Sequence, residues 1–162
     1  MRRTVLSAVL ASAALLSGCA SHSPGPAAPA IVTVRVDQAG RDKRFEFTLH
    51  GVETGLKSVG RSGFVQNTAA GTYVIATFWI KNITTGPQDF RNSDVTLVDT
   101  QGRRFAVDDS ATMTYNLDHA VDPTYTGMPA GKILVARMVF DVPMDAVLSH
   151  VMFLDDVKAT LL

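Results

Sequence analysis

A run of β-branched and aromatic residues between Tyr73 and Lys81 constrains the fold of this chain more than any other part of its sequence. Successive side chains of a β-strand point to opposite faces of a sheet. One face of the predicted strand is wholly apolar and is formed by Val74, Ala76, Phe78 and Ile80. We therefore expect a strand with Phe78 in a core and Trp79 on the other side of the sheet.

Further strand-like segments are spread along the chain and are separated by Gly, Asn, Asp and Pro. They cover residues 31–36, 45–50, 95–98, 104–107, 133–142, 151–154 and 159–162. The segments 95–98 and 104–107 flank a short loop with a glycine, which indicates a hairpin. Residues 110–119 and 144–148 could hold helix, but both stretches are too short to change the fold class. The sequence predicts an all-β protein, an antiparallel β-sandwich.

The chain begins with two arginines and an apolar run ending at Leu16, which is the layout of a secretory signal peptide. This run is shorter than the roughly 20 residues of a membrane-spanning helix. The residues that follow complete the sequence Leu-Ser-Gly-Cys, which resembles the lipobox of bacterial lipoproteins. The resemblance implies cleavage before Cys19 and addition of diacylglycerol to its thiol. The alternative is an ordinary signal peptide followed by a chance cysteine.

Three parts are therefore predicted. Residues 1–18 form a lipoprotein signal peptide, residues 19–30 form the lipidated cysteine and a flexible Pro/Ala/Ser tether, and residues 31–162 form one folded domain. Cys19 is the only cysteine, so the folded domain has no internal disulfide and no cysteine nucleophile or cysteine-based zinc site. We expect the core to be held by packing alone.

The charge balance limits the classes of partner. The formal net charge of the whole chain is zero, and loss of the two arginines with the signal peptide makes the mature protein slightly acidic. Such a protein lacks the basic stripe typical of nucleic-acid binding and the polybasic patch that binds anionic lipid. We expect it to be held at the extracytoplasmic face of the cell membrane by acyl chains on Cys19.

From Gly71 onward the order of several short motifs resembles a known family. The motifs are Gly71 to Asn82, Gln88-Asp89-Phe90, Asp94 to Asp99, Pro129-Ala130-Gly131-Lys132 and Val139 to Pro143. Their order is similar to that of the telokin-like domain of unknown function found in bacterial envelope lipoproteins and secreted antigens. One departure is Pro129-Ala130-Gly131, where the family more often has Pro-Gly directly. The resemblance implies an immunoglobulin-like β-sandwich at the cell envelope, and it implies no reaction.

No catalytic or metal-binding motif is present in the sequence. The four histidines lie on separate segments and lack a metal-ligand spacing. A triad could be assembled from Ser110, His119 and Asp122, but no nucleophile elbow supports it. We expect no enzyme activity, no cofactor and no metal site, although acidic residues near 108–122 leave a cation site open as an alternative.

The candidate binding residues are Met113, Tyr115 and Tyr125, in the long segment 108–128, together with Trp79. Long connections in compact domains are often functional, and aromatic residues and Met are common in recognition surfaces. Alternatively, the segment caps one end of the sandwich. Trp79 either forms an exposed patch or is covered by the segment, and we favour covering. The predicted function is a non-catalytic binding module for an unidentified envelope protein. The alternative is a small-ligand or cation carrier that uses the 108–128 segment.

The lipobox generates the first prediction. Cys19→Ala should abolish incorporation of labelled fatty acid and leave the precursor uncut, because the cysteine thiol is the acceptor for the lipid. Membrane affinity should fall with it, since each buried CH₂ of an acyl chain contributes about 0.8 kcal/mol. Labelling and detergent partitioning measure both effects, and a mutant that still takes up fatty acid would contradict the lipobox.

Overall fold

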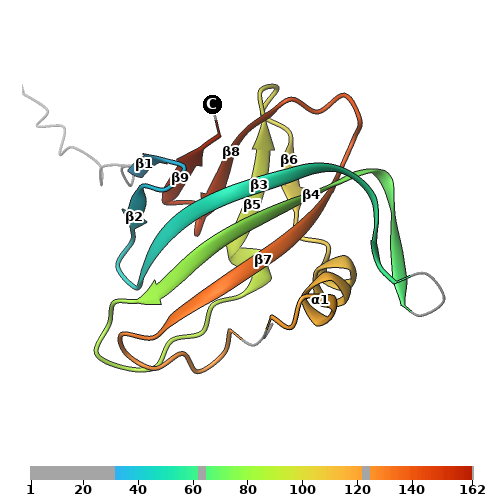
Figure 1. The fold of residues 1–162 in the computed structure, drawn as a ribbon. Helices are drawn as coiled ribbons and strands as arrows, with labels where there is room; N and C mark the ends of the chain where they lie inside the picture. Colours follow the sequence, from blue (N-terminus) through green and yellow to red (C-terminus); the bar gives the residue numbers. More distant parts are fainter. Residues whose placement is uncertain (1–31, 62–64, 122–124, 162) are drawn as a thin grey trace, which may run out of the picture.

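The computed structural model describes residues 32–61, 65–121 and 125–161, and they form a β-sandwich of two sheets (Figure 1). The first sheet has the order β1 (Val32–Arg35), β9 (Val157–Thr160), β8 (Leu148–Phe153), β5 (Val95–Asp99) and β6 (Arg104–Ala106). The second has the order β2 (Ala39–Arg41), β3 (Phe45–Gly60), β4 (Gln66–Asn82) and β7 (Ile133–Val142). A short 3₁₀ helix, η1 (Asn92–Asp94), and one α-helix, α1 (Asp109–Asp118), complete the fold.

The predicted fold class is confirmed. Both sheets are antiparallel except for the β1–β9 pair, which is parallel. The hairpin predicted between residues 95 and 107 is present as β5 and β6, and the helix predicted within 110–119 is present as α1. Residues 144–148 contain a turn and no helix. The predicted signal peptide, Cys19 and the tether lie outside the described residues.

Strand β3 is much longer than the sequence indicated, because bulges hide its pattern. The expected segment ended at residue 50, whereas β3 continues to Gly60. Its register against β4 shifts between Leu49 and Gly51, between Thr54 and Leu56, and between Leu56 and Ser58. Each shift reverses which side chains face the core, so regular alternation is lost. A further strand, β2, was not expected, since its residues Ala-Gly-Arg have low β-propensity.

Five phenylalanines join the two sheets, and we call them the aromatic cluster. Its members are Phe45, Phe47, Phe78, Phe90 and Phe153, and all are buried. Phe47 from the second sheet stacks on Phe153 from the first with ring centroids 4.6 Å apart. Phe78 meets the same Phe153 edge-on at 5.0 Å. Such aromatic pairs contribute about 0.5–1.5 kcal/mol each beyond the burial of their surface.

Helix α1 protects the outer edge of β7. The Asp108 N–H donates to the carbonyl of Val139 at 2.8 Å, and the Val139 N–H donates to Thr112 Oγ1 at 2.9 Å. The Asn116 side-chain amide donates to the carbonyl of Arg137 at 3.1 Å. An edge strand otherwise presents unpaired backbone groups to other chains. The helix therefore satisfies this part of the edge with its own backbone and polar side chains.

The inner faces of β4 and β7 give the second prediction. Phe78→Ala and Phe140→Ala should each lower the free energy of unfolding by about 3–5 kcal/mol, because both rings are fully buried between the sheets. Thr77→Ala, on the outer face of β4, should cost far less. Urea unfolding of the three variants measures the difference. A loss below about 1 kcal/mol for both phenylalanine variants would show that neither ring supports the core.

Candidate functional site

The two tyrosines of the 108–128 segment are buried in the protein. Tyr115 is 7% exposed and packs with Val59, Tyr73, Ile75, Ala111 and Val139 under helix α1. Tyr125 is 5% exposed and meets Phe90 edge-on with ring centroids 6.1 Å apart. The expectation that Tyr115 and Tyr125 form a binding surface is therefore corrected, because neither ring is accessible. Their position matches the alternative, in which the segment caps the core.

The surroundings of Tyr115 include His119, one member of the triad considered from the sequence. Its ring stacks on the His119 imidazole at 4.0 Å, and His119 Nδ1 lies 2.8 Å from the Tyr115 carbonyl oxygen. Burial raises the pKa of the Tyr115 hydroxyl, and the nearby Glu53 carboxylate raises it further. Ser110 Oγ accepts a hydrogen bond from Asn67 at 2.8 Å. Ser110 and His119 are thus engaged in different contacts, and Asp122 lies outside the described residues.

Met113 remains accessible on the outer side of α1, where it is 58% exposed. Leu117, one turn further along the helix, is also exposed. Residues three and four apart lie on the same side of a helix. Of the residues that sequence reasoning selected in the 108–128 segment, only Met113 is therefore available to a partner in this structure.

Trp79 lies on an open part of the outer face of the second sheet. It is 49% exposed, which contradicts the expectation that the 108–128 segment covers it. Helix α1 covers Tyr73 and Ile75 on the same face but does not extend to Trp79. Val135 is the cross-strand partner of Trp79 on β7, and both Val135 and Ile133 are exposed. We call Trp79, Ile133 and Val135 the Trp79 face.

His50 supports the Trp79 ring from the neighbouring strand. The two rings meet edge-on with centroids 4.3 Å apart. His50 Nδ1 lies 2.8 Å from Asp37 Oδ1, so the imidazole is itself held in place. The Trp79 ring therefore packs against His50 and remains half open to solvent.

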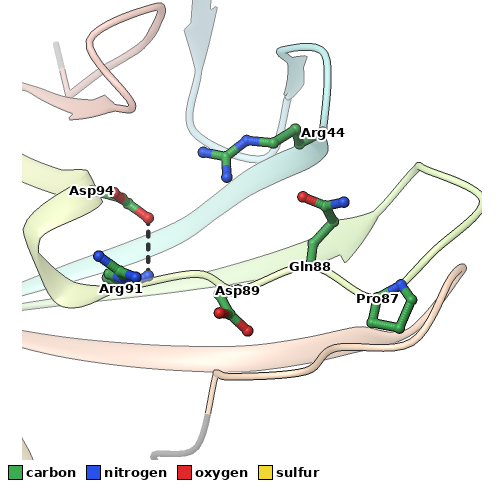
Figure 2. Close-up of a pocket in the computed structure, with 6 residues that line it drawn as sticks. All are labelled: Arg44, Pro87, Gln88, Asp89, Arg91 and Asp94. Atoms are coloured by element: carbon green, nitrogen blue, oxygen red, sulfur yellow. Dashed lines mark hydrogen bonds between the residues drawn. The ribbon is translucent and has the colours of Figure 1, made fainter.

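A polar hollow of about 480 Å³ lies among the loops at one end of the sandwich (Figure 2). It is lined by Arg44, Pro87, Gln88, Asp89, Arg91 and Asp94, and we call it the loop pocket. Arg44 directly precedes β3, whereas the other five residues lie between β4 and β5. Sequence reasoning named Gln88 and Asp89 as part of a family motif and did not select the arginines, because nothing in the sequence indicates that residues 44 and 91 line one pocket.

Backbone hydrogen bonds fix the walls of the loop pocket. The backbones of Gln88 and Met128 bond each other in both directions, at 3.0 and 2.8 Å. Asp89 Oδ1 accepts from the Gly127 N–H at 2.7 Å, and Asp94 Oδ2 accepts from the Arg91 N–H at 2.9 Å. The Gln88–Met128 and Asp89–Gly127 contacts join the segment before η1 to the segment 125–128. The pocket is therefore preformed by hydrogen bonds within the protein.

Two searches of the described residues bear on other kinds of site. Within residues 32–61, 65–121 and 125–161, no three His, Cys, Asp or Glu side chains are grouped as a metal site requires. In the same part of the chain, no helix has the length and apolar character to cross a membrane.

A family model described as Domain of unknown function (DUF4352) matches residues 34–157, which is well over half of the chain. The chain belongs to the DUF4352 family. A search of curated proteins finds no match to this DUF4352 chain.

Solved structures similar to this DUF4352 chain share its β-sandwich fold. A conserved hypothetical protein from Bacillus anthracis has a TM-score of 0.66 and 16% identity, over 80% of this chain and 95% of that one. The secreted protein MPT63 from Mycobacterium tuberculosis has a TM-score of 0.58 and 14% identity, over 80% of this chain and 97% of that one. An uncharacterized β-sandwich protein from Clostridium difficile has a TM-score of 0.52 and 16% identity, over 86% of this chain and 98% of that one. At these identities the likeness establishes the fold alone.

The third prediction separates capping from binding in the 108–128 segment. Tyr115→Ala should lower the free energy of unfolding by about 3 kcal/mol or more, because it empties a buried aromatic position. Met113→Ala on the same helix should stay within about 0.5 kcal/mol of wild type, since the side chain is exposed. Thermal unfolding of both variants provides the measurement. Equal melting temperatures for Tyr115→Ala and wild type would contradict the capping role.

Proposed function

We propose that this DUF4352 chain is a lipid-anchored, non-catalytic binding module of the bacterial cell envelope, of the telokin-like kind that its sequence resembles. The support for its location is the signal-peptide layout and the Leu-Ser-Gly-Cys sequence ending at Cys19. MPT63, a structural neighbour, is a secreted protein. In this proposal, acyl chains on Cys19 hold the domain on the extracytoplasmic face of the cell membrane, and residues 19–30 space it from the lipid.

The observation that carries the binding role is the Trp79 face. An apolar patch that is exposed and rimmed by polar residues is typical of a protein interaction site. Tryptophan is among the residues that contribute most to binding energy at interfaces. Here contact with His50 restricts the Trp79 ring, which reduces the conformational entropy lost when a partner covers it.

The surroundings of the Trp79 face favour a protein partner. Lys81 and Arg137 flank Trp79 and Val135 along the same face, and Arg41 pairs with Glu46 beyond them. A polar, charged rim around an apolar centre is the common anatomy of protein interfaces. A flat sheet face of this kind suits a protein surface better than a small molecule, which binds in concave sites. The proposed partner is another protein of the envelope.

The positions of the histidines support a non-catalytic role. His50 lies beside Asp37 and Trp79, His119 lies on Tyr115, and His150 lies beside Ser149. Burial lowers the pKa of His150, and the positive charges of Lys158 and Arg104 lower it further. Nucleophilic catalysis by a histidine normally combines a nucleophile, the imidazole and a third group that orients it. Among the described residues, His50 contacts a carboxylate but no hydroxyl, and His150 contacts a hydroxyl but no carboxylate.

A second candidate function is carriage of a small ligand, and the loop pocket is the observation that favours it. The 108–128 segment, which we first expected to bind the ligand, is largely occupied by α1 and buried side chains. Three of its acidic residues already make structural contacts. Asp108 caps α1, Asp109 accepts from Asn92 at 2.7 Å, and Asp118 pairs with Arg61 at 3.2 Å. A carrier function is therefore better supported at the loop pocket, and for a polar ligand rather than for a cation.

The fourth prediction tests the Trp79 face. Partner proteins should be captured with the full-length, membrane-extracted protein and be lost with Trp79→Ala, because truncation removes the central aromatic contact. Val147→Ala is the matched control, since this exposed apolar side chain lies beyond the other end of β7. Chemical cross-linking followed by mass spectrometry compares the three samples.

Thermal unfolding of the same variants shows whether any loss of capture comes from misfolding. The proposal expects Trp79→Ala to keep nearly the wild-type melting temperature. An unchanged set of captured proteins with Trp79→Ala would count against the Trp79 face as the interaction site.

A further inference from the structure

We propose that the loop pocket binds a zwitterionic ligand, namely a free amino acid or a short peptide with free termini. This inference names the ligand class for the carrier function and is independent of the Trp79 face. It rests on the charged side chains that line the pocket, on the absence of ion pairs at its two arginines within the described residues, and on the core residues that position them.

The first step is the state of the two arginines. Arg41, Arg61, Arg103 and Arg104 each pair with a carboxylate. Arg44 and Arg91 form no ion pair with any residue of 32–61, 65–121 or 125–161, although both line the same pocket. A guanidinium presents planar N–H groups that match a carboxylate in a two-point contact. The pocket therefore offers two such groups to a ligand.

The second step is how the fold places these arginines together. Arg44 immediately precedes Phe45, and Arg91 immediately follows Phe90. The rings of Phe45 and Phe90 meet edge-on in the aromatic cluster with centroids 5.6 Å apart. The Arg44 guanidinium also lies over the Phe45 ring at 5.2 Å, a cation–π contact that limits its motion. Burial of the two rings thus sets both arginines at one pocket.

The third step is the pair of carboxylates in the same pocket. Asp89 and Asp94 each accept one backbone N–H with one of their oxygens. Figure 2 shows the Arg44 side chain extending toward Arg91 and Asp94, while Asp89 points the opposite way. With two arginines and two aspartates, the lining has no net charge. A simple anion such as phosphate between the arginines would meet the Asp94 carboxylate, and the repulsion of like charges disfavours it.

A ligand with both charges fits this lining. Its carboxylate would lie between Arg44 and Arg91, and its ammonium group would donate to the remaining oxygen of Asp94. Each charge then meets its opposite, so the cost of removing both from water is offset. The hollow of about 480 Å³ has room for a dipeptide-sized molecule. Its polar lining also disfavours an apolar ligand, which would leave these groups unpaired.

The fifth prediction is a titration of the full-length protein in detergent micelles with three matched probes, followed by NMR. Alanylalanine carries both charges, N-acetyl-alanylalanine carries only the carboxylate, and alanylalanine amide carries only the ammonium group. Alanylalanine should bind at least tenfold more tightly than either relative, a difference of about 1.4 kcal/mol. Its chemical-shift changes should centre on the backbone amides of residues 44 and 88–94. Inorganic phosphate is the fourth probe and should not compete.

Substitutions in the pocket complete the test. Arg44→Ala and Arg91→Ala should each weaken alanylalanine at least tenfold, and Arg44→Lys and Arg91→Lys should weaken it as well, since lysine lacks the two-point geometry. Arg41→Ala is the matched control, because Arg41 lies nearby and pairs with Glu46 outside the pocket. Trp79→Ala should leave the titration unchanged, which separates this site from the Trp79 face.

Three results of the titrations with alanylalanine and its relatives would overturn the proposal. They are the absence of a saturable shift with alanylalanine, equal binding of the N-acetyl or amide relative, and wild-type affinity in both alanine variants of the pocket arginines. Tighter binding of phosphate than of alanylalanine would equally overturn it, in favour of a simple anion site. The comparison among probes uses the wild-type protein, so it decides the question even if a variant fails to fold.

Discussion

The contact between the two sheets through the aromatic cluster is the interaction on which the rest of this structure depends. With Cys19 as its only cysteine, the chain has no internal disulfide to hold the sheets together. Phe47 and Phe78 of the second sheet both meet Phe153 of the first, at 4.6 and 5.0 Å. Burial of such rings is the largest single favourable contribution available to a domain of this size. The alternation of apolar residues in β4 therefore reflects the need to place one row of side chains in the core between the sheets.

The same cluster also organises the loops at one end of the sandwich. Phe90 comes from a loop rather than a strand, yet its ring is buried against Phe45 and Phe47. Its N–H donates to the carbonyl of Tyr125 at 2.9 Å, and the Tyr125 ring packs on it in turn. Two segments that are far apart in sequence are thereby fixed to the core. The loop pocket follows from this arrangement, because its polar residues are the chain neighbours of buried aromatic ones.

The sequence predicted those features that depend on regular periodicity or on a local motif, and missed those that depend on contacts distant in sequence. The faces of β4 followed from alternation, and the α1 region lacked any strand pattern. The full length of β3 did not follow, because bulges interrupt its alternation. The buried face of α1 was also hidden, since it includes Thr112 and Asn116, which bond the edge of β7. From the sequence alone, polar residues at such positions are predicted to be exposed, because their backbone partners are distant in the chain.

The buried side chain of Asn82 connects the end of β4 to the neighbouring loops through hydrogen bonds. Its side-chain amide donates to the carbonyls of Gly86 and Met128, both at 2.8 Å. Its carbonyl oxygen accepts from the N–H and the hydroxyl of Thr84, both at 2.9 Å. A buried amide with all its hydrogen bonds satisfied rigidifies its surroundings, whereas a partly satisfied one destabilises them. Asn82 ends β4 three residues after Trp79 and begins the loop that leads to the pocket. The Asn82 side chain therefore fixes the boundary between the open sheet face and the loops. Its hydrogen bonds add to the packing of the core in a domain that has no internal disulfide.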